Sequence, residues 1–254
     1  MFFIEAGINH FGSEKLAKKI VNYFNKSSFS NLSFMLHTRK IYDDFIKKGM
    51  DFELSSKFYK NLIKSCHENK KKVGLSVCDI KTFKKHQTLN FDFYKLMSLS
   101  INNYKLIKEL RKKNKPIYIS TGFKSKIINI RKCLKAFKNK KNLTLLHTPM
   151  TYNVSELNFP NINYLREKFK LDVGYSNHNN DIDSLNVLSA YKPKVIFLYC
   201  KPLRDKQKVY PDDDHALYLD ELEDVKNKYN SYLQANTFKK RLIKVNIFKK
   251  AVKK

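Results

Sequence analysis

The stretch LDVGYSNHNNDIDSLNVLSAYKPKVIFLYC, residues 171–200, contains one complete unit of the fold that this sequence predicts. Two short apolar runs, Leu171–Gly174 and Val195–Tyr199, have the length and composition of buried strands. The segment between them, Asp181–Tyr191, is predicted to be a helix. A strand, a helix and a second strand in this order predict two parallel strands joined by a helical crossover.

The same alternation of short apolar runs and longer amphipathic segments continues along the whole chain. The expected strands are Phe2–Ala6, Leu32–Leu36, Lys72–Val77, Phe91–Met97, Pro116–Ser120, Leu143–Leu146, Leu171–Gly174 and Val195–Tyr199. The expected helices are Glu14–Phe24, Ser55–Asn69, Ile80–His86, Asn102–Lys113, Asn161–Phe169, Asp181–Tyr191 and Tyr218–Tyr232, and one more after the fifth strand with Ile127, Ile130, Leu134 and Phe137 on one face. Residues 37–54 are longer and mixed, which predicts a loop with a short helix.

This order of elements predicts a parallel sheet covered by helices. Eight repeats in about 235 residues match a (β/α)₈ TIM barrel of the α/β class in number and length. The alternative is a doubly wound open sheet, which usually has a glycine-rich phosphate loop after an early strand. Residues 8–12 have the position of such a loop but lack its glycines.

The composition fits a single large domain with a strongly basic surface. Apolar residues make up 42% of the 254 residues, and 51 Lys and Arg against 23 Asp and Glu give a net charge of +28. Such a charge suits nucleic acid, an anionic membrane surface or a phosphorylated substrate. The lysines are spread along the chain, whereas a nucleic-acid footprint clusters on one face. A solvated lysine surface is therefore expected, and nucleic acid is not the expected partner.

Several features predict a cytoplasmic protein. The chain has 4 cysteines and no CxxC pair, which fits a reducing compartment. Its first apolar run is too short for a signal peptide, and no run of about 18 apolar residues predicts a membrane span. We expect a barrel over residues 1–236 and a basic C-terminal extension over 237–254. The extension would either pack under the barrel as a short helix or bind an anionic surface.

In a parallel barrel, the residues that follow each strand converge on one face, where active sites lie. A lysine among hydroxyls suits a phosphate or carboxylate ligand, and carboxylates with histidine suit a divalent metal ion. The polar residues at the expected strand ends are Glu5, Asn9, His10, His37, Ser76, Asp79, Lys95, Ser98, Ser120, Thr121, His147, Tyr152, Ser176, His178, Tyr199, Asp214 and His215.

Six motifs at these strand ends resemble those of the sialic acid (nonulosonic acid) synthases, in the same order and with similar spacing. They are IEAGINHFG at 4–12, YKLMS at 94–98, STG at 120–122, LLHTPMTY at 145–152, VGYSNH at 173–178 and PDDDHALYLDEL at 211–222. The resemblance covers roughly residues 1–225 and implies a (β/α)₈ barrel, in agreement with the strand count.

The resemblance implies an enzyme that condenses phosphoenolpyruvate with an open-chain N-acylated amino sugar in surface-glycan biosynthesis. The product would be a nine-carbon nonulosonic acid, and phosphate would be released. A divalent metal ion, Mn²⁺ or Mg²⁺, would polarise the sugar aldehyde. The residues that the motifs carry over are Glu5 and Asp214 as catalytic residues, Tyr152 as a sugar contact, His178 as a metal ligand, and Ser76, Lys95, Ser98, Ser120 and Ser176 as phosphoenolpyruvate contacts.

Four positions or segments depart from the family pattern. Met35-Leu36-His37 stands where the family has Lys-Phe-Gln, and Leu99-Ser100 replaces a Gly-Glu pair whose glutamate transfers a proton. Tyr199 replaces the second histidine ligand, and a neutral phenol is a poor ligand for a hard cation near pH 7. The family's C-terminal antifreeze-like domain, which reaches a neighbouring subunit in a dimer, would begin about where this sequence ends.

Two alternatives stay open, the first because of these departures and the second because of the net charge and the basic residues 237–254. The first is a non-catalytic barrel that binds a sugar or a partner chain and has lost the metal site. The second is a basic protein that binds nucleic acid or an anionic surface, with an affinity that falls steeply with salt concentration.

Overall fold

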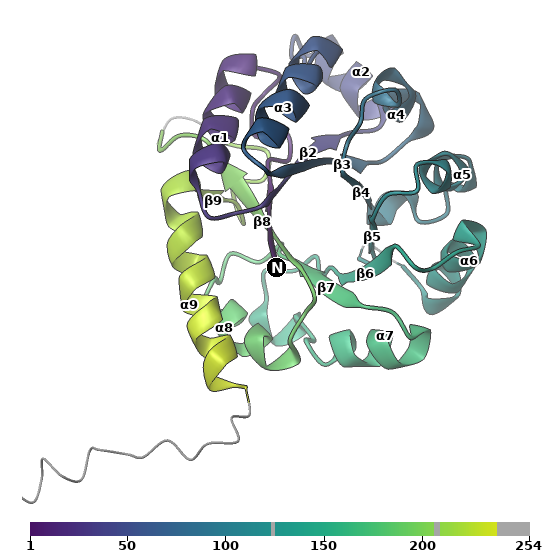
Figure 1. Ribbon diagram of the computed structural model, residues 1–254, viewed down its shortest axis with the longest axis vertical. Coiled ribbons are helices and arrows are strands. Elements are labelled where there is room, and N and C mark those ends of the chain that lie inside the picture. Colours follow the sequence, from purple (N-terminus) through teal and green to yellow (C-terminus); the bar gives the residue numbers. More distant parts are fainter. Residues whose placement is uncertain (123–124, 206–208, 238–254) are drawn as a thin grey trace, which may run out of the picture.

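The computed structural model describes residues 1–122, 125–205 and 209–237, and a closed parallel barrel lies at its centre (Figure 1). Within the described residues the barrel strands are hydrogen-bonded in sequence order, and β1 also pairs with β8. The strands are β1 (Phe2–Glu5), β2 (Asn31–Leu36), β3 (Lys72–Val77), β4 (Phe93–Leu96), β5 (Ile117–Ser120), β6 (Leu143–His147), β7 (Val173–Ser176) and β8 (Ile196–Lys201). Closure by β1 and β8 confirms the TIM barrel and shows that the open-sheet alternative is wrong.

The helices form a ring outside the barrel (Figure 1). They are α1 (Glu14–Lys26), α2 (Arg39–Lys47), α3 (Ser56–Glu68), α4 (Ile80–His86), α5 (Tyr104–Lys112), α6 (Ile127–Phe137), α7 (Asn161–Phe169), α8 (Ser184–Leu188) and α9 (Leu222–Ala235). Side-chain oxygens cap several of them; the hydroxyl of Ser13, for example, accepts a hydrogen bond from the backbone of Leu16 at the start of α1. A short strand, β9 (Leu217–Tyr218), pairs with the end of β8.

Most predicted bounds agree with the structure within two residues, and β3, α4 and α7 agree at both ends. Strand β7 lies two residues later than predicted, because its pairing continues through Tyr175 and Ser176. The predicted helix at 181–191 is shorter, since α8 ends at Leu188 and a 3₁₀ turn follows. Thr237 is the last described residue, so the rest of the predicted extension lies outside the described residues.

An aromatic and aliphatic layer closes the lower part of the barrel interior. The rings of Phe3 and Phe197 stack at 4.5 Å between centroids, and Phe93 packs edge-on against Phe3 at 5.0 Å. Because side chains alternate along a strand, the residues two positions later point to the same side. Glu5, Lys95 and Tyr199 therefore form a layer directly above Phe3, Phe93 and Phe197, at the C-terminal mouth.

Two glycines on the strands make room for this lower layer. A Cβ atom at Gly74 would lie 2.4 Å from the Phe93 ring, and one at Gly174 would lie 2.4 Å from Cγ2 of Val195. Each of these glycines thus lies against a larger side chain of a neighbouring segment, as close packing requires.

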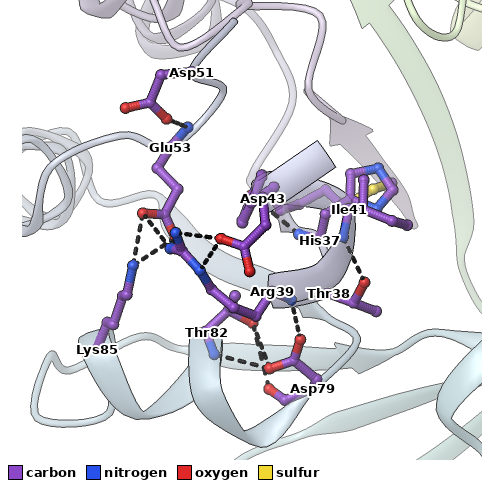
Figure 2. Close-up of polar contacts among 12 residues, drawn as sticks. His37, Thr38, Arg39, Ile41, Asp43, Asp51, Glu53, Asp79, Thr82 and Lys85 are labelled. Atoms are coloured by element: carbon purple, nitrogen blue, oxygen red, sulfur yellow. Dashed lines mark hydrogen bonds and ion pairs between the residues drawn. The ribbon is translucent and has the colours of Figure 1, made fainter. Parts of the chain in front are cut away.

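A network of charged groups fixes the loop between β2 and α2 at the mouth (Figure 2). Arg39 donates to Asp43 at 2.8 Å and lies 3.3 Å from Glu53, which also binds Lys85 at 2.7 Å. The backbone N–H of Arg39 donates to Asp79, the N-cap of α4. Single exposed ion pairs contribute little, but this network joins the loop after β2 to the loop after β3.

Within the described parts of the chain, the helices are too short or too polar to span a bilayer.

We expect Gly174→Ala to destabilise the barrel by roughly 1–3 kcal/mol, because the added methyl group would overlap Val195 in a packed interior. The free energy of unfolding from urea titration measures this effect. Gly49→Asn is a suitable control, since nothing lies within 4 Å of the added Cβ and asparagine tolerates the positive φ of 74°. Equal stabilities for Gly174→Ala and the parent protein would show that the interior is looser than described.

Candidate functional site

A buried ion pair lies at the centre of the barrel mouth. The ammonium nitrogen Nζ of Lys95 is 3.4 Å from Oε2 of Glu5, and the two side chains are 2% and 0% exposed. The same nitrogen donates a hydrogen bond to the hydroxyl of Ser176 at 3.1 Å. It also lies 4.6 Å from the ring centroid of Phe197 and 5.2 Å from that of Tyr199. Strands β1, β4, β7 and β8 therefore position one ammonium group together.

Hydroxyl and backbone donors complete the surroundings of the Glu5 carboxylate. Ser76 donates to Oε2 at 2.5 Å, and the hydroxyls of Ser76 and Ser33 are 2.9 Å apart. The backbone N–H of Gly7 donates to Oε1 at 3.4 Å. Burial lowers the pKa of Lys95, and the negative charge of Glu5 opposes this shift. The charge of Lys95 therefore depends on its ion pair with Glu5.

A cavity of about 230 Å³ lies above Lys95. Its size is just below the range of about 300–1,000 Å³ that is common for sites of drug-sized ligands, so it suits a smaller molecule. One cation and several hydroxyls face it, which is the chemistry of a phosphate or carboxylate site. The lining residues are Lys95, Met97, Ser98, Leu99, Ser120, Thr148, Met150, His178 and Tyr199.

Two histidines and a tyrosine form an aromatic cluster on one side of the mouth. The ring centroids of His178 and His215 are 5.0 Å apart, and Tyr199 lies 5.0 Å from the first and 4.8 Å from the second. The Nδ1 atom of His178 is 3.1 Å from the backbone oxygen of Ser176. Burial lowers the pKa of His178 well below its ordinary value and lowers that of His215 to about 4. Both imidazoles are therefore neutral near pH 7.

Asp212 lies beside this cluster, held by the loop after β1. Its backbone N–H donates to Asn9 at 3.1 Å, and the amide of Asn9 donates to the backbone of Cys200 at 2.7 Å. A Cβ at Gly7 would be 2.2 Å from Oδ2 of Asp212, so only glycine allows this approach. Burial, and then the charge of Glu5, raise the pKa of Asp212 to about 7. Its carboxyl group therefore changes charge near neutral pH.

His178, the predicted metal ligand, has at position 199 a tyrosine where the resemblance expects a second histidine, and these two side chains do not fit a divalent cation. Burial raises the pKa of Tyr199 well above its ordinary value, so the phenol stays protonated and is a poor ligand. Among the described residues, no three His, Cys, Asp or Glu side chains are grouped so that they could hold one ion.

The structure brings most of the predicted site residues together. Glu5, Ser76, Lys95 and Ser176 form the contacts described above, and Ser98, Ser120 and His178 line the cavity. Their individual roles stay predictions.

Tyr152 and Asp214 lie outside this group, at the rim. Tyr152 is 54% exposed, and its hydroxyl donates to an Asp214 oxygen at 3.0 Å. Asp214 itself is exposed, and the buried carboxylate from the same segment is Asp212. Asp214 therefore lies at the rim and its predicted catalytic role stays a prediction, while the carboxyl group of this segment that lies beside His215 and Gly7 is that of Asp212. The reason is that the backbone tether to Asn9 turns Asp212, two residues earlier, inward.

Sequence reasoning also missed Ser33, whose position two residues before the inward-facing Met35 was the available signal. The substituted positions have acquired structural contacts of their own. Ser100, where the resemblance expects a glutamate, is buried and donates to the backbone oxygen of Cys78. Met35 is 4% exposed and packs among apolar side chains.

Comparison with known proteins decides the family. A model described as the NeuB family matches residues 17–240. The chain belongs to the NeuB family. It is 28% identical over 208 residues to the N,N'-diacetyllegionaminic acid synthase of Campylobacter jejuni subsp. jejuni serotype O:2, covering 72% of this chain and 61% of that protein.

A shorter match extends the same relationship. The pseudaminic acid synthase of the same organism is 32% identical over 90 residues, covering 34% of this chain and 26% of that protein. This NeuB-family chain therefore spans less than two thirds of the length of these curated relatives.

Solved structures agree with the barrel. The N-acetylneuraminic acid synthetase of Leptospira borgpetersenii serovar Hardjo-bovis superposes with a TM-score of 0.82 at 19% identity, over 99% of this chain and 90% of that one. A truncated 3-deoxy-D-arabino-heptulosonate 7-phosphate synthase from Thermotoga maritima gives a TM-score of 0.71 at 14% identity, over 92% and 87%. At these levels of sequence identity, the structural similarity establishes the fold of this chain.

We expect Lys95→Met and Glu5→Gln to behave as partners in a double-mutant cycle. Lys95→Met leaves a buried carboxylate without its cation, at a cost of about 3–5 kcal/mol. The double variant removes both charges and should recover much of that loss, which urea unfolding measures. Additive losses in the double variant would show that the two charges are not coupled in the folded protein.

We expect the stability of the fold to fall as pH decreases through the range set by His10. Burial lowers the pKa of His10 to about 3, so below about 6.5 the unfolded chain binds a proton that the folded chain excludes. The contribution of neutral His10 to the free energy of unfolding is complete above pH 6.5 and is lost as the pH falls towards 3. By pH 5 this loss amounts to about 2 kcal/mol. His10→Gln should reduce the loss between pH 7.5 and pH 5 by that amount in urea titrations. Equal losses in both proteins would contradict the assignment.

Proposed function

We propose that this NeuB-family barrel binds phosphoenolpyruvate in the mouth and condenses it with an N-acylated amino sugar to give a nonulosonic acid. One observation carries the proposal, namely that the ammonium of Lys95 is buried at the base of a cavity that is also lined by Ser98 and Ser120. A fixed cation among hydroxyls suits a small molecule that carries both a phosphate and a carboxylate. The names of the two Campylobacter synthases support the product class.

The contacts around Lys95 explain how such an anion would be oriented. Glu5, Ser176 and two aromatic rings hold the ammonium in place, so little side-chain entropy is lost when a ligand binds. The charge of Glu5 opposes the lowering of the pKa of Lys95 by burial and so favours the charged ammonium. Ser98 and Ser120 add hydroxyl donors, while Leu99 and Met150 are apolar parts of the same wall.

The proposed reaction forms one carbon–carbon bond. Carbon 3 of phosphoenolpyruvate attacks the sugar aldehyde, whose oxygen takes up a proton. Water adds to carbon 2, and the carbon–oxygen bond to phosphate then breaks, so phosphate leaves. Ser100 replaces the expected glutamate and is already engaged with the backbone of Cys78. Loss of a general base typically costs 10²–10⁴-fold in rate, so we expect turnover to be slow.

The same substitutions favour a second candidate function, a barrel that binds the anion without turning it over. Ser100 cannot act as a base at neutral pH, and Tyr199 does not fit as a metal ligand. This candidate predicts phosphoenolpyruvate binding without release of phosphate from any amino sugar.

Two measurements test the proposal and separate the candidates. Calorimetry with phosphoenolpyruvate should show binding that Ser120→Ala or Lys95→Met weakens by about 10–100-fold, the loss expected for a charged hydrogen-bonding ligand. Lys57→Met, at an exposed position on α3, is the matched control and should bind normally. Phosphate release with Mn²⁺ and a panel of N-acylated amino sugars, including N-acetylmannosamine, then tests turnover. Absence of binding by the parent protein would reject both candidates.

A further inference from the structure

The end of the barrel opposite the mouth carries a concentration of positive charge. Because the barrel strands are parallel, the turns that lead from each helix into the next strand lie together at this end. Helices α6 and α7 are neighbours in the ring (Figure 1), and two hollows of about 680 and 330 Å³ lie at their ends and share one lining residue. The turn residues that line these hollows include Lys138, Lys140, Lys141 and Lys170, here called the basal lysines.

The charge of the basal lysines is not compensated. All four are exposed, and none forms an ion pair with another residue that the structure describes. Asp172, a carboxylate in the larger hollow, pairs instead with Lys194 at 3.3 Å. At the mouth, in contrast, Lys201 binds Asp213 at 2.6 Å, and the arginine and lysine of the network in Figure 2 share Glu53. Uncompensated positive charge therefore gathers at the end opposite the mouth.

The backbone at this end is strained where it places some of these cations. Lys138 and Lys170 end α6 and α7 with φ angles of 62° and 53°, and Lys70 and Lys192 have φ angles of 56° and 48° in two other turns of the same end. Glycine or asparagine is common at such positions, because a Cβ atom disfavours the left-handed region. The helix dipole favours a cation at a helix end, but this attraction fades within one turn and does not account for Lys141, nearer to β6.

The C-terminal part of the chain adds positive charge at the same end. Just past α9, the amide of Asn236 donates to the hydroxyl of Ser189 at 2.7 Å, in the turn that precedes β8. The sequence of residues 238–254, which lie outside the described residues, contains eight lysines and arginines and no aspartate or glutamate. Leucine, isoleucine, valine and phenylalanine lie between these cations, a composition typical of segments that bind an anionic membrane surface.

We propose that the basal lysines form a docking surface for a bilayer that contains anionic lipids. The lysines come from separate turns around one end of a barrel, which suits a broad surface of phosphate headgroups better than the narrow backbone of a nucleic acid. Phe169 is the aromatic ring among the residues that line the two hollows, and at 9% exposure it is too buried to stack on a base.

This orientation leaves the mouth free. The basal lysines lie before β6 and β7, whereas Lys95 and its cavity lie at the opposite end of the strands. With the basal lysines against a membrane, the cavity therefore faces the surrounding solution and stays open to ligands. The inference does not rest on the proposed function, because it concerns another surface of the barrel.

Vesicle sedimentation with the 254-residue chain tests the inference. Vesicles of phosphatidylcholine and phosphatidylglycerol in a ratio of roughly 7:3 should bind the protein at about 50 mM NaCl, whereas vesicles of phosphatidylcholine alone should not. Raising NaCl to about 300 mM should release most of the protein, since salt screens exposed charges.

A triple variant shows whether the basal lysines carry the binding. Lys140→Glu, Lys141→Glu and Lys170→Glu together should weaken binding to the mixed vesicles by at least about 100-fold, since each cation near an anionic surface contributes roughly fivefold. Binding of phosphoenolpyruvate, measured by calorimetry, should not change in this variant. Circular dichroism confirms that the variant is folded.

A matched control separates the basal surface from net charge. Lys15→Glu, Lys57→Glu and Lys60→Glu together give the same net charge, but these exposed lysines lie near the starts of α1 and α3, towards the mouth. This control should therefore bind the mixed vesicles much more tightly than the basal variant does.

Several outcomes would overturn the inference. They are equal binding to both kinds of vesicle, equal losses in the two triple variants, and parent-like binding by the basal variant, which would assign the binding to residues 238–254 alone. Tighter binding to a short DNA duplex than to the mixed vesicles, at the same NaCl concentration, would show that nucleic acid and not a bilayer is the partner.

Discussion

The ion pair between Glu5 and Lys95 is the constraint on which the mouth of this barrel depends. The layer of Phe3, Phe93 and Phe197 lies directly below it and keeps bulk water away from one side. A charge above that layer must be compensated from within the protein, because each isolated ion would cost several kcal/mol to bury. The serines on β2, β3 and β7 are explained by the same need, since they supply the hydrogen bonds that water would otherwise provide.

The alternation of short apolar runs with longer amphipathic segments was enough to predict the barrel and most bounds of its strands and helices. The predicted bounds of α4 and α7 agree with the structure at both ends, because polar or turn residues, such as Asp79 before α4 and Pro160 before α7, lie on both sides of each helix. Strand β7 was placed two residues early, because its last residue is Ser176, which points into the polar layer with Lys95. Hydrophobicity marks where a strand is packed against apolar neighbours, and an inward polar residue gives no such signal.

The candidate site was predictable to the extent that it lies on strands. Glu5, Ser76, Lys95 and Ser176 take their directions from the period of two, so motif position alone brought them together. Asp212 and Asp214 lie in a loop, where the direction of a side chain depends on tertiary contacts. The tether between Asn9 and Asp212 joins residues 203 positions apart, and local sequence does not reveal it.

The positions that depart from the family pattern share one physical property. Met35, Ser100 and Tyr199 are neutral where the resemblance expects a lysine, a glutamate and a metal-binding histidine, and all three are buried or nearly so. Each replacement reduces the cost of desolvation, and the mouth retains its central charges in Lys95, Glu5 and the titrating Asp212. His215 does not follow this trend, since it is a largely buried imidazole with two unpaired nitrogens beside the tyrosine. His10 and His37 also bury a ring nitrogen without a hydrogen bond, so the mouth tolerates neutral imidazoles as well as apolar side chains. His215 lies two residues before β9, and the free-energy cost of its two unpaired nitrogens must be offset by the packing of its ring against Tyr199 and His178.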